Sequence, residues 1–434
     1  MVAIDLHSGE LIENDAIKQK MAEKKPYADW NQVFRESLPT PDFLGADHDD
    51  PISKAVEDDL ITLEFDSGYT IEDTEMVVES MAQTGKEPTF CMGNDKPLAI
   101  LSERPHVLYD YFTQRFAQVT NPAIDPYREA LVMSVEVYLG RQGNIMAERP
   151  TYFQNLSTNN RLLRVDSPML HERELDAIRS SGLLTVELST RYAHTDGPGT
   201  LEKRLSDLCY EASNAVRNGA ELIILSDIER PTEGGNQAQG LGVEKDQLAI
   251  PALLAVGAVH HYLIQQGLRT QASLIMNTGQ CWSTHHFACL IGYGASAVCP
   301  YLALAHIRKW HSTEKGKVKA DGQTVEQCQD NFRKAIVGGL KKIMSKMGIS
   351  VLESYRGAQI FQCIGLHDEV IDVAFKGTPA TMGALTFGDV ANESMLMHRK
   401  AFPELELGES AAKLDFAGWY KYMKSKGEFH MNNP

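Results

Sequence analysis

Residues 220–227, AELIILSD, form a nearly continuous apolar run of the kind found in a strand that is covered on both faces. Before this run, apolar residues recur at helical spacing over residues 201–216, and Gly219 follows as a helix stop. After it, Pro251 stands at a favoured first-turn position of a second helical pattern through residues 252–264. A buried strand between two helices predicts a βαβ arrangement with parallel strands.

The same alternation continues toward the C-terminus. Strands are predicted at 271–277, QASLIMN, at 297–301, AVCPY, and at 349–354, ISVLES, with helices at 285–291 and 325–346. This rhythm predicts an α/β fold with a parallel sheet. A complete or broken (β/α) barrel is the first expectation and an open doubly wound sheet is the second.

The two ends of the chain are patterned differently. Residues 38–51 are rich in proline and aspartate, which does not suit the interior of a regular element and predicts a linker. Residues 71–81, IEDTEMVVESM, predict a helix that ends at the turn signal Thr84-Gly85-Lys86. Beyond about residue 370 the sequence becomes polar and amphipathic, with an aromatic-rich stretch at 419–423.

The composition excludes several classes of protein. The 434 residues carry 42 Lys and Arg against 58 Asp and Glu, and this formal net charge of −16 excludes a nucleic-acid binder that relies on a basic face. No apolar run approaches the roughly 20 residues needed to span a bilayer, and no export or organelle signal is expected at the start. The seven cysteines are scattered and form no C-x-x-C pair, so we expect reduced thiols, without structural zinc or thioredoxin-like chemistry.

Two motifs near residue 290 have a functional and a structural interpretation. Residues 292–297, GYGASA, superficially match a dinucleotide fingerprint, but a helix precedes the glycines and a strand follows them, which favours a simple helix-to-strand turn. Cys281, His285 and Cys289 fall at i, i+4 and i+8, with His286 alongside, and could hold a metal ion. No fourth ligand lies at close spacing, so buried thiols that pack inward are the favoured interpretation.

Polar residues follow the predicted strands, where an α/β barrel places its chemistry. They are Asp227, Asn277, Thr278, Tyr301 and Arg356. These residues could bind a polar small molecule, with Asp227 as a base and Arg356 as an anion clamp. They could equally cap the following helices and pair with one another in a plugged barrel.

The segment 109–126, YDYFTQRFAQVTNPAIDP, is dense in polar residues and prolines. Pro122 and Pro126 restrict Asn121 and Asp125 to extended or turn conformations. The structural interpretation is a rigid loop with an Asx turn. The functional interpretation is a fixed wall that presents Gln118, Thr120, Asn121 and Asp125 to a channel or an interface.

Several long blocks make the chain resemble the central domain of glutamate synthase. They are residues 85–99, GKEPTFCMGNDKPLA; 116–126, FAQVTNPAIDP; 283–301, STHHFACLIGYGASAVCPY; and 345–350, SKMGIS, with 354–359, SYRGAQ. The block at 283–301 is most similar to the ferredoxin-dependent form of cyanobacteria and plastids. The resemblance runs over nearly the whole chain.

The resemblance implies a degenerate or incomplete barrel-like central domain with connecting segments at both ends. Residues 1–35 look like the tail of the amidotransferase domain, residues 36–85 like a helical linker, residues 86–370 like the central α/β domain, and residues 371–434 like a connector toward the FMN-binding domain. In such a domain, which holds no cofactor, the structural interpretation of Asp227 and Arg356 becomes the stronger one.

The implied enzyme is an oxidoreductase acting on CH-NH2 donors that serves ammonia assimilation and glutamate biosynthesis. It hydrolyses glutamine, passes ammonia through an internal tunnel and combines it reductively with 2-oxoglutarate on FMN, with electrons from ferredoxin delivered through a 3Fe-4S cluster. This chain would bridge the glutaminase and FMN sites. We expect Thr120 and Asn121 to line the ammonia conduit, with Gln118 and Asp125 holding the loop, because ammonia must travel uncharged and shielded from water.

The chain by itself is expected to be inactive and to hold no catalytic residue, metal or cofactor. It begins Met1-Val2 instead of with the nucleophilic cysteine of an amidotransferase, and its first cysteine is Cys91. The C-x5-C-x4-C spacing of the cluster is not found, since Cys281, Cys289 and Cys299 are separated by eight and ten residues. FMN and the 3Fe-4S cluster are expected in other parts of a complete enzyme.

Two alternatives stay open. The chain could be a stand-alone barrel enzyme that acts on a small acid through Asp227, Asn277 and Arg356, or a non-catalytic protein that docks onto the other synthase domains. Ferredoxin and NAD(P)H both stay open as electron donors, as do a fragment, a split gene product and a truncated gene. The expected location is the plastid stroma for a photosynthetic eukaryote and the cytoplasm otherwise.

Overall fold

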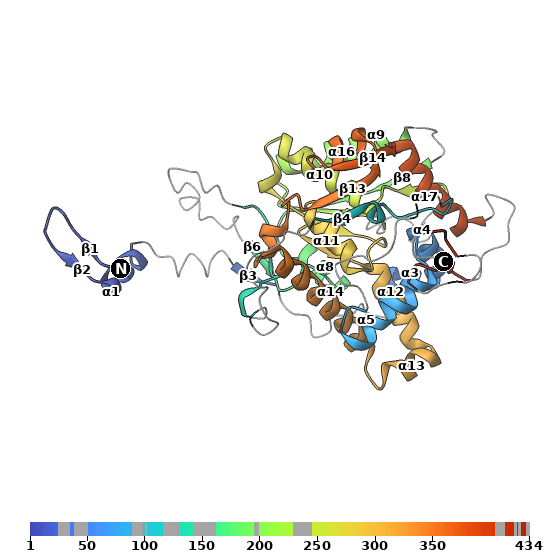
Figure 1. Ribbon diagram of the computed structural model, residues 1–434, viewed down its shortest axis with the longest axis horizontal. Helices are drawn as coiled ribbons and strands as arrows, with labels where there is room; N and C mark the ends of the chain where they lie inside the picture. The colour runs from blue at the N-terminus through green and yellow to red at the C-terminus, as the bar shows by residue number, and fades with distance from the viewer. Residues whose placement is uncertain are drawn as a thin grey trace.

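The computed structural model describes most of the chain (Figure 1). The described residues are 1–24, 35–38, 51–88, 99, 102–115, 128, 131–142, 162–194, 199–228, 245–403, 413–420, 423 and 427–430. Over these residues, no helix is both long enough and apolar enough to cross a membrane.

A parallel sheet of four strands lies at the centre of the molecule. In order across the sheet, its strands are β7 (Thr185–Ser189), β9 (Leu222–Ser226), β11 (Ser273–Asn277) and β12 (Ala297–Cys299). Every residue of β9, β11 and β12 is buried, as expected for strands covered on both faces. The register pairs the last residues of all four strands, Ser189, Ser226, Asn277 and Cys299, in one row.

Helices connect successive strands, which confirms the βαβ prediction. They are α9 (Thr200–Arg217), α10 (Ala252–Gln265) and α11 (Thr284–Gly292). Each lies within two residues of its predicted range, because each has a clear apolar period and a Pro or Gly near an end. Most residues of α10 are buried, because it packs between α9 and α16 (Asp368–Ala374) as well as on the sheet.

Strand order follows chain order and does not reverse within this sheet, unlike a doubly wound sheet. Beyond β12, Val298 pairs in parallel with Met169, which precedes β7 in the chain. The described strands nevertheless form separate small sheets and no closed ring. The structure therefore shows a mixed α/β fold with a parallel sheet, and the described strands do not form a complete barrel.

Two boundaries near the predicted strands differ from expectation. The strand predicted at 297–301 ends at Cys299, and Tyr301 begins α12 (Tyr301–Ser312). The strand predicted at 349–354 is wrong. Only Val351 forms a bridge, with Ser134, and the short helix α15 (Leu352–Tyr355) follows at once. Its two buried residues, Leu352 and Tyr355, are three apart, which is helical spacing that a six-residue apolar stretch cannot reveal.

A second sheet follows α15. Strand β13 (Phe361–Leu366) pairs in parallel with β14 (Ala380–Leu385) and antiparallel with β4 (Phe112–Gln114). Smaller pairings join β8 (Arg191–Ala193) with β10 (Gln247–Ala249), and β6 (Leu162–Val165) with both β3 (Arg35–Ser37) and β5 (Val137–Leu139). Antiparallel pairs were not anticipated, because three-residue strands carry almost no periodic signal.

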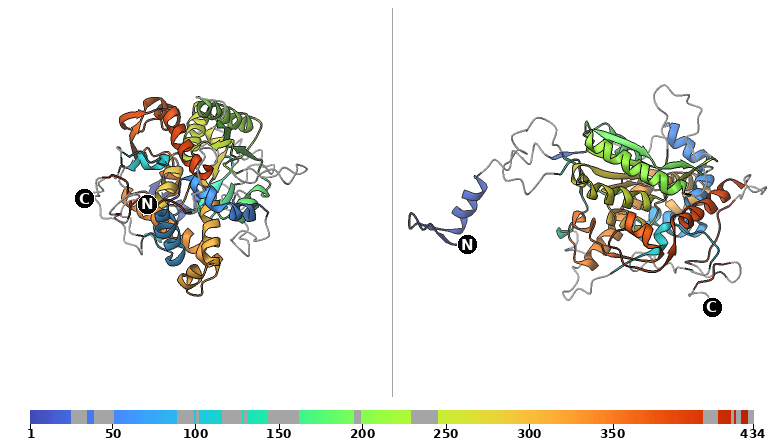
Figure 2. Two further views of the ribbon diagram at one scale, coloured as in Figure 1. Left: turned by 90° about the vertical axis from the view of Figure 1, so that its right-hand side faces the viewer. Right: turned by 90° about the horizontal axis from the view of Figure 1, so that it is seen from above.

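A layer of helices covers the side of the molecule opposite α9 and α10 (Figure 2). It contains α3 (Pro51–Asp58), α4 (Leu60–Ser67), the π-helix η1 (Asp73–Val78), α5 (Glu79–Thr84), α12, α13 (Glu314–Ala320) and α14 (Val325–Met347). Helix α17 (Phe387–Ala401) packs against α4 of this layer and also contacts α9. The predicted helices at 71–81 and 325–346 are confirmed here. Both belong to the same core as the sheet, since Val77, Met81 and Phe332 are buried in it.

The remaining described elements are one pair of strands and four helices. They are β1 (Ala3–Ile4), β2 (Leu11–Ile12), α1 (Asn14–Ala22), the 3-10 helices η2 (Leu108–Tyr111) and η4 (Arg269–Gln271), and α8 (Glu172–Arg179). The first three lie apart from the rest of the molecule (Figure 1), and α1 has no buried residue.

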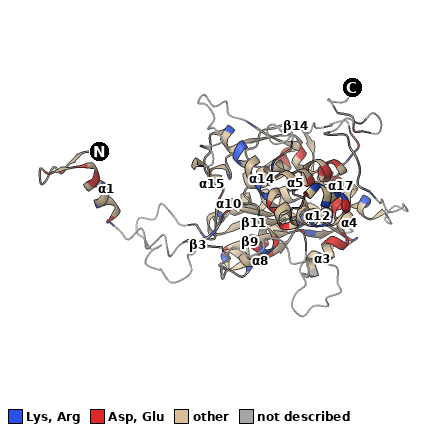
Figure 3. Ribbon diagram, turned by 90° about the horizontal axis from the view of Figure 1, so that it is seen from below, with Lys and Arg blue, Asp and Glu red and all other residues tan. Residues whose placement is uncertain are grey.

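Two buried cations on α12 hold the helical layer to its neighbours. The Arg308 guanidinium donates to Glu57 at 2.5 Å and to Glu172 at 2.9 Å, although only 2% of its side chain is exposed. Two residues earlier in the same helix, His306 Nδ1 lies 2.5 Å from Glu64 Oε1. Acidic and basic residues are interspersed over the described helices (Figure 3), so much of the acidity of the chain is locally balanced.

Candidate functional site

The aligned strand ends bring together four of the five predicted strand-end residues, all except Arg356. Thr278 Oγ1 donates to Asp227 Oδ2 at 2.6 Å, and the backbone N–H of Gly279 donates to the same carboxylate at 3.1 Å. Asn277 Nδ2 donates to Ser226 Oγ at 3.1 Å. Because the strands end in register, each of these residues reaches across to the neighbouring strand.

The Asp227 carboxyl is buried and fully engaged. Burial raises its pKa to about 6, although hydrogen bonds from Thr278 and Tyr301 and the N–H of Gly279 favour the charged form. Arg191 Nε donates to the backbone carbonyl of Asp227 at 3.0 Å and adds a stabilising charge. These contacts tie Asp227 to neighbouring residues of the core.

Arg356 does not join this cluster. The predicted strand that was to place it is absent, and Arg356 instead follows α15. Its guanidinium donates to Ser296 Oγ at 3.0 Å and pairs with Glu353. Ser296 directly precedes β12, so Arg356 lies near the N-terminal end of that strand, whereas Asp227 follows the C-terminal end of β9. The described contacts therefore do not bring Arg356 to Asp227.

The cysteine and histidine motif packs inward. His285 Nε2 lies 3.0 Å from the Tyr109 carbonyl oxygen, and Cys289 Sγ lies 3.6 Å from the same nitrogen. Burial raises the pKa of the Cys281 and Cys289 thiols well above the usual value, which disfavours the thiolate that a metal requires. Among the described residues, no three His, Cys, Asp or Glu side chains group to hold a metal.

In the fingerprint-like motif, Gly292 ends α11 and Gly294 lies between α11 and β12, which confirms the helix-to-strand turn. A Cβ on Gly292 would lie 2.5 Å from the Phe361 ring, and one on Gly294 would lie 2.3 Å from His260 Nδ1. The glycines therefore permit close packing of neighbouring side chains. This role needs no nucleotide.

The predicted wall residues Gln118, Thr120, Asn121 and Asp125 lie outside the described residues. The chain leading to them is described: β4 ends at Gln114, and the N–H of Arg115 donates to the Ile360 carbonyl at 2.6 Å. Gln114 is only 9% exposed, and neither atom of its side-chain amide has a hydrogen-bond partner in the described part of the protein. Such orphaned groups are rare and costly in folded proteins.

A second cluster, which no sequence motif predicted, anchors the segment 413–420. The Glu72 carboxylate, 1% exposed, accepts the backbone N–H groups of Gly418 at 2.7 Å, Trp419 at 2.9 Å and Tyr420 at 3.0 Å. Gly418 has φ of +80°, a conformation that favours glycine. The aromatic-rich stretch at 419–423 was the only sequence signal, since an acidic residue in a first helical turn normally faces solvent.

Further contacts fix the same segment. His106 lies between two carboxylates, with Nδ1 2.8 Å from Asp110 Oδ2 and Nε2 2.8 Å from Glu428 Oε1. The indole N–H of Trp419 donates to Glu428. Burial opposes the charged form of Glu428, but its hydrogen bonds outweigh this and lower its pKa to about 2.

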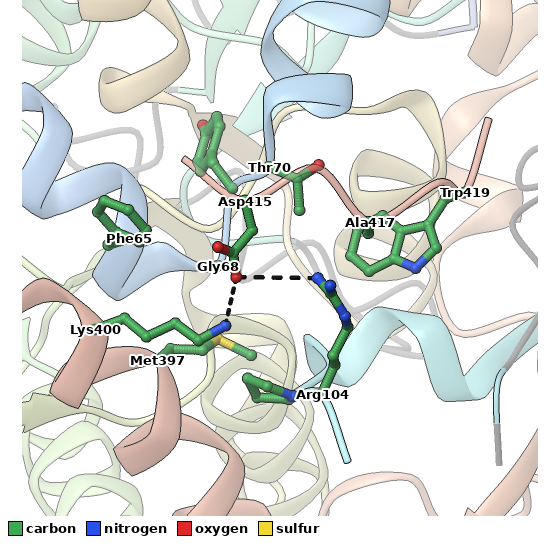
Figure 4. Close-up of a pocket in the computed structure, with 11 residues that line it drawn as sticks. Phe65, Gly68, Thr70, Arg104, Met397, Lys400, Asp415, Ala417 and Trp419 are labelled. Carbon is green, nitrogen blue, oxygen red and sulfur yellow. Dashed lines mark hydrogen bonds and ion pairs between the residues drawn. The ribbon is translucent and has the colours of Figure 1, made fainter. Parts of the chain in front are cut away.

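A hollow lies where this segment meets α4 and α17 (Figure 4). The Asp415 carboxylate there contacts Lys400 Nζ at 2.7 Å and Arg104 Nη1 at 4.0 Å, and Met397 and Trp419 contribute apolar surface. Its volume of about 30 Å³ holds little more than one water molecule. The hollow is therefore a joint between segments and is too small for an organic substrate.

Comparisons with known proteins place the chain in a family. The sequence pattern described as "Glutamate synthase central domain" matches residues 64–367. The ferredoxin-dependent glutamate synthase 2 of Synechocystis sp. is 46% identical over 442 residues, covering 100% of this chain and 26% of that protein. The chloroplastic ferredoxin-dependent glutamate synthase of Spinacia oleracea is also 46% identical, over 445 residues, covering 100% of this chain and 25% of that protein.

The chain thus spans about a quarter of the length of these relatives. Among solved structures, a mutant flavocytochrome b2 with bound pyruvate reaches a TM-score of 0.32 at 10% identity, covering 86% of this chain and 100% of that chain, and this weak likeness supports no conclusion. Since the family pattern covers residues 64–367 and the identity extends along the whole chain, the chain belongs to the glutamate synthase central domain family.

Proposed function

We propose that this chain is the central part of a ferredoxin-dependent glutamate synthase, where it bridges the glutaminase and FMN sites and lines the path of ammonia between them. The observation that carries this proposal is the 46% identity that spans the whole chain. The complete enzyme would form glutamate from glutamine and 2-oxoglutarate. Its amidotransferase and FMN-binding domains would be the partners of this chain, and ferredoxin would donate electrons.

We assign FMN and the 3Fe-4S cluster to other parts of the complete enzyme. The described residues fit neither group, since the strand ends are closed by side chains and the buried thiols are protonated. No chemical step is therefore assigned to a residue of this chain. Its contribution would be to shield ammonia from water and protonation, and to hold the flanking segments in place.

The proposed division of the chain is a tail of the amidotransferase domain at 1–35, a helical linker at 36–85, the central α/β domain at 86–370, and a connector toward the FMN-binding domain at 371–434. The hydrogen bonds from the backbone of residues 418–420 to Glu72 support a connector that leaves the core in a fixed direction. Sequential strand order supports descent of the central sheet from an incomplete (β/α) barrel.

We further propose that Thr120 and Asn121 line the ammonia conduit and that Gln118 and Asp125 hold the loop. Support comes from Gln114 at the start of this segment. A buried amide that finds no partner among the described residues suits a wall facing a small polar molecule that passes by. An amide can donate to or accept from such a molecule without a charge that would retain ammonium.

The two alternatives predict different behaviour. A stand-alone enzyme at the strand ends would need Asp227 free to act, whereas its carboxylate is tied to Thr278 and Gly279. A docking protein would bind the other domains without conducting ammonia. The relative from Spinacia oleracea is named as chloroplastic, and we propose the plastid stroma for this chain if its source is a photosynthetic eukaryote, and the cytoplasm otherwise.

The test is coupling in a complete enzyme that contains this chain. Asn121→Ala should leave glutamine hydrolysis in place but lower the glutamate formed per glutamine hydrolysed. Asp227→Asn, which keeps the shape of the strand-end cluster, should leave that ratio unchanged. Unchanged coupling in Asn121→Ala would favour a docking role, and turnover by the purified chain alone would favour the stand-alone enzyme.

A further inference from the structure

A hollow that no role above explains lies between α10, the end of α11, β13 and the loop after α16. Its volume is about 480 Å³, within the range of small-molecule sites. Its buried floor contains His260, Gly292, Tyr293 and Phe361, and its exposed rim contains Ile264, Gln265, Gln359 and Lys376. It lies near the N-terminal ends of the parallel strands, away from Asp227 and Thr278 at their C-terminal ends.

His260 offers a hydrogen-bond donor to this cavity. The side chain of Arg269 donates from Nε to His260 Nδ1 at 2.8 Å, so Nδ1 is an acceptor. Burial, together with the nearby charge of Arg269, lowers the pKa of His260 to about 2, so the ring is neutral with its proton on Nε2. His260 is 8% exposed, and its Nε2 has no hydrogen-bond partner among the described residues.

The position of this donor follows from its neighbour. A Cβ on Gly357, a cavity residue, would lie 4.0 Å from His260 Nε2. The Nε2 atom of His260 therefore lies on the side of the cavity that Gly357 lines. Across the same side, Gln359 has φ of +54° and donates from Nε2 to the Lys376 carbonyl at 3.4 Å. A strained non-glycine residue of this kind is frequent where a ligand is clamped.

The charges around the cavity favour an anion. The Arg269 side chain, which donates to His260, also donates to the carbonyl oxygens of Ala272 and Gly294, both at 2.7 Å. It forms no ion pair among the described residues. Lys376 adds an ammonium group at the rim, and none of the described lining residues is acidic. On a chain with a net charge of −16, this is a local exception that would attract an anion.

We propose that this cavity binds a small organic carboxylate, whose charged end meets His260 Nε2 and Lys376 and whose apolar part packs against Tyr293, Phe361 and Ile264. Two donors and one accessible full charge match a single carboxylate better than a dianionic phosphate. The aromatic floor excludes a ligand that is charged throughout. Arg269 acts as a positioning residue, because its hydrogen bond fixes the proton of His260 on the nitrogen that faces the ligand.

The test is calorimetric titration of the purified chain at neutral pH with benzoate as the probe and benzamide as its uncharged counterpart. Benzoate should bind saturably. Benzamide should bind more weakly than benzoate by at least a factor on the order of ten. Lys376→Glu should weaken benzoate binding on the order of tenfold. The matched control Lys203→Glu makes the same charge change on an exposed residue near the start of α9, and it should leave binding unchanged.

His260→Asn keeps an acceptor for Arg269 but shortens the side chain, and it should weaken benzoate binding on the order of tenfold. Thermal unfolding shows whether His260→Asn folds. If this variant does not fold, the effect of Lys376→Glu on benzoate binding tests the proposal by itself. Equal affinities for benzoate and benzamide, equal effects of the two lysine variants, or displacement of benzoate by equimolar inorganic phosphate would overturn the proposal. None of these measurements depends on glutamate synthase activity.

Discussion

Glu72→Gln tests whether a single buried carboxylate holds the C-terminal connector against the core. In the structure, Glu72 Oε2 accepts N–H groups from Gly418 and Trp419, and Oε1 accepts the N–H of Tyr420. Glutamine has nearly the same shape, but only one of its two terminal atoms accepts hydrogen bonds. If the remaining oxygen keeps the first two donors, the new NH2 group faces the N–H of Tyr420.

The expected cost follows from these contacts. A hydrogen bond to a charged group contributes about 1.5–3 kcal/mol, against about 1 kcal/mol for a neutral one. The variant loses one such bond, weakens two others and leaves buried donors facing each other, so docking of residues 413–420 should weaken by about 2–4 kcal/mol. At about 1.4 kcal/mol for each factor of ten, opening of this segment should become about 30- to 800-fold more frequent.

The assay is hydrogen exchange of the backbone amides of Gly418, Trp419 and Tyr420, resolved by NMR. Glu75→Gln is the matched control, because Glu75 lies one turn along the same helix but its side chain is 47% exposed and pairs with Lys315 at the surface. The control should leave these amides protected. The reasoning is refuted if both variants exchange at the same rate, or if Glu72→Gln accelerates the whole chain equally.

Two further predictions concern stability. Burial opposes protonation of His306, but the carboxylates of Glu64 and Glu79 outweigh it and raise the pKa of His306 to about 9. The stabilisation that the charged His306 contributes is therefore complete below about pH 6.5 and is lost as the pH rises through 9. Urea unfolding should show the wild type losing about 3 kcal/mol more than His306→Gln between pH 6.5 and 9.5, and parallel pH profiles would contradict this. On α14, Gly338→Ala should stabilise by about 0.5–1 kcal/mol through helix propensity, whereas Gly339→Ala should destabilise by about 1–3 kcal/mol. A Cβ at Gly339 would lie 2.5 Å from Thr284 Cγ2, while one at Gly338 meets no atom within 4 Å, and the reverse order of melting temperatures would contradict this packing.

The sequence predicts the parallel sheet and its helices well because their signals are local. Long apolar periods, Gly219 after α9 and Pro251 before α10 mark these elements within a residue or two. The short strands β4, β8 and β10 were missed, since three residues carry no measurable period. Whether a sheet closes into a barrel depends on pairing between distant strands, which no single segment encodes.

Prediction of site residues succeeded where neighbours follow from the sheet and failed where they depend on other segments. Asp227 and Thr278 come together because parallel strands end at one edge. Arg356 was misplaced because its supposed strand is a short helix. The partners of Glu72 lie more than three hundred residues away in the chain, and no local pattern could pair them. The roles of Gln118 and Asn121 stay predictions.

The most direct test of the account follows the nitrogen atom itself. A complete enzyme containing this chain is supplied with glutamine labelled with 15N in its side-chain amide, together with an excess of unlabelled ammonium, and the label in newly formed glutamate is measured. An enclosed path predicts that the wild type retains nearly all of the label and that Asn121→Ala admits unlabelled nitrogen. Equal retention in both proteins would contradict the claim that this segment encloses the path.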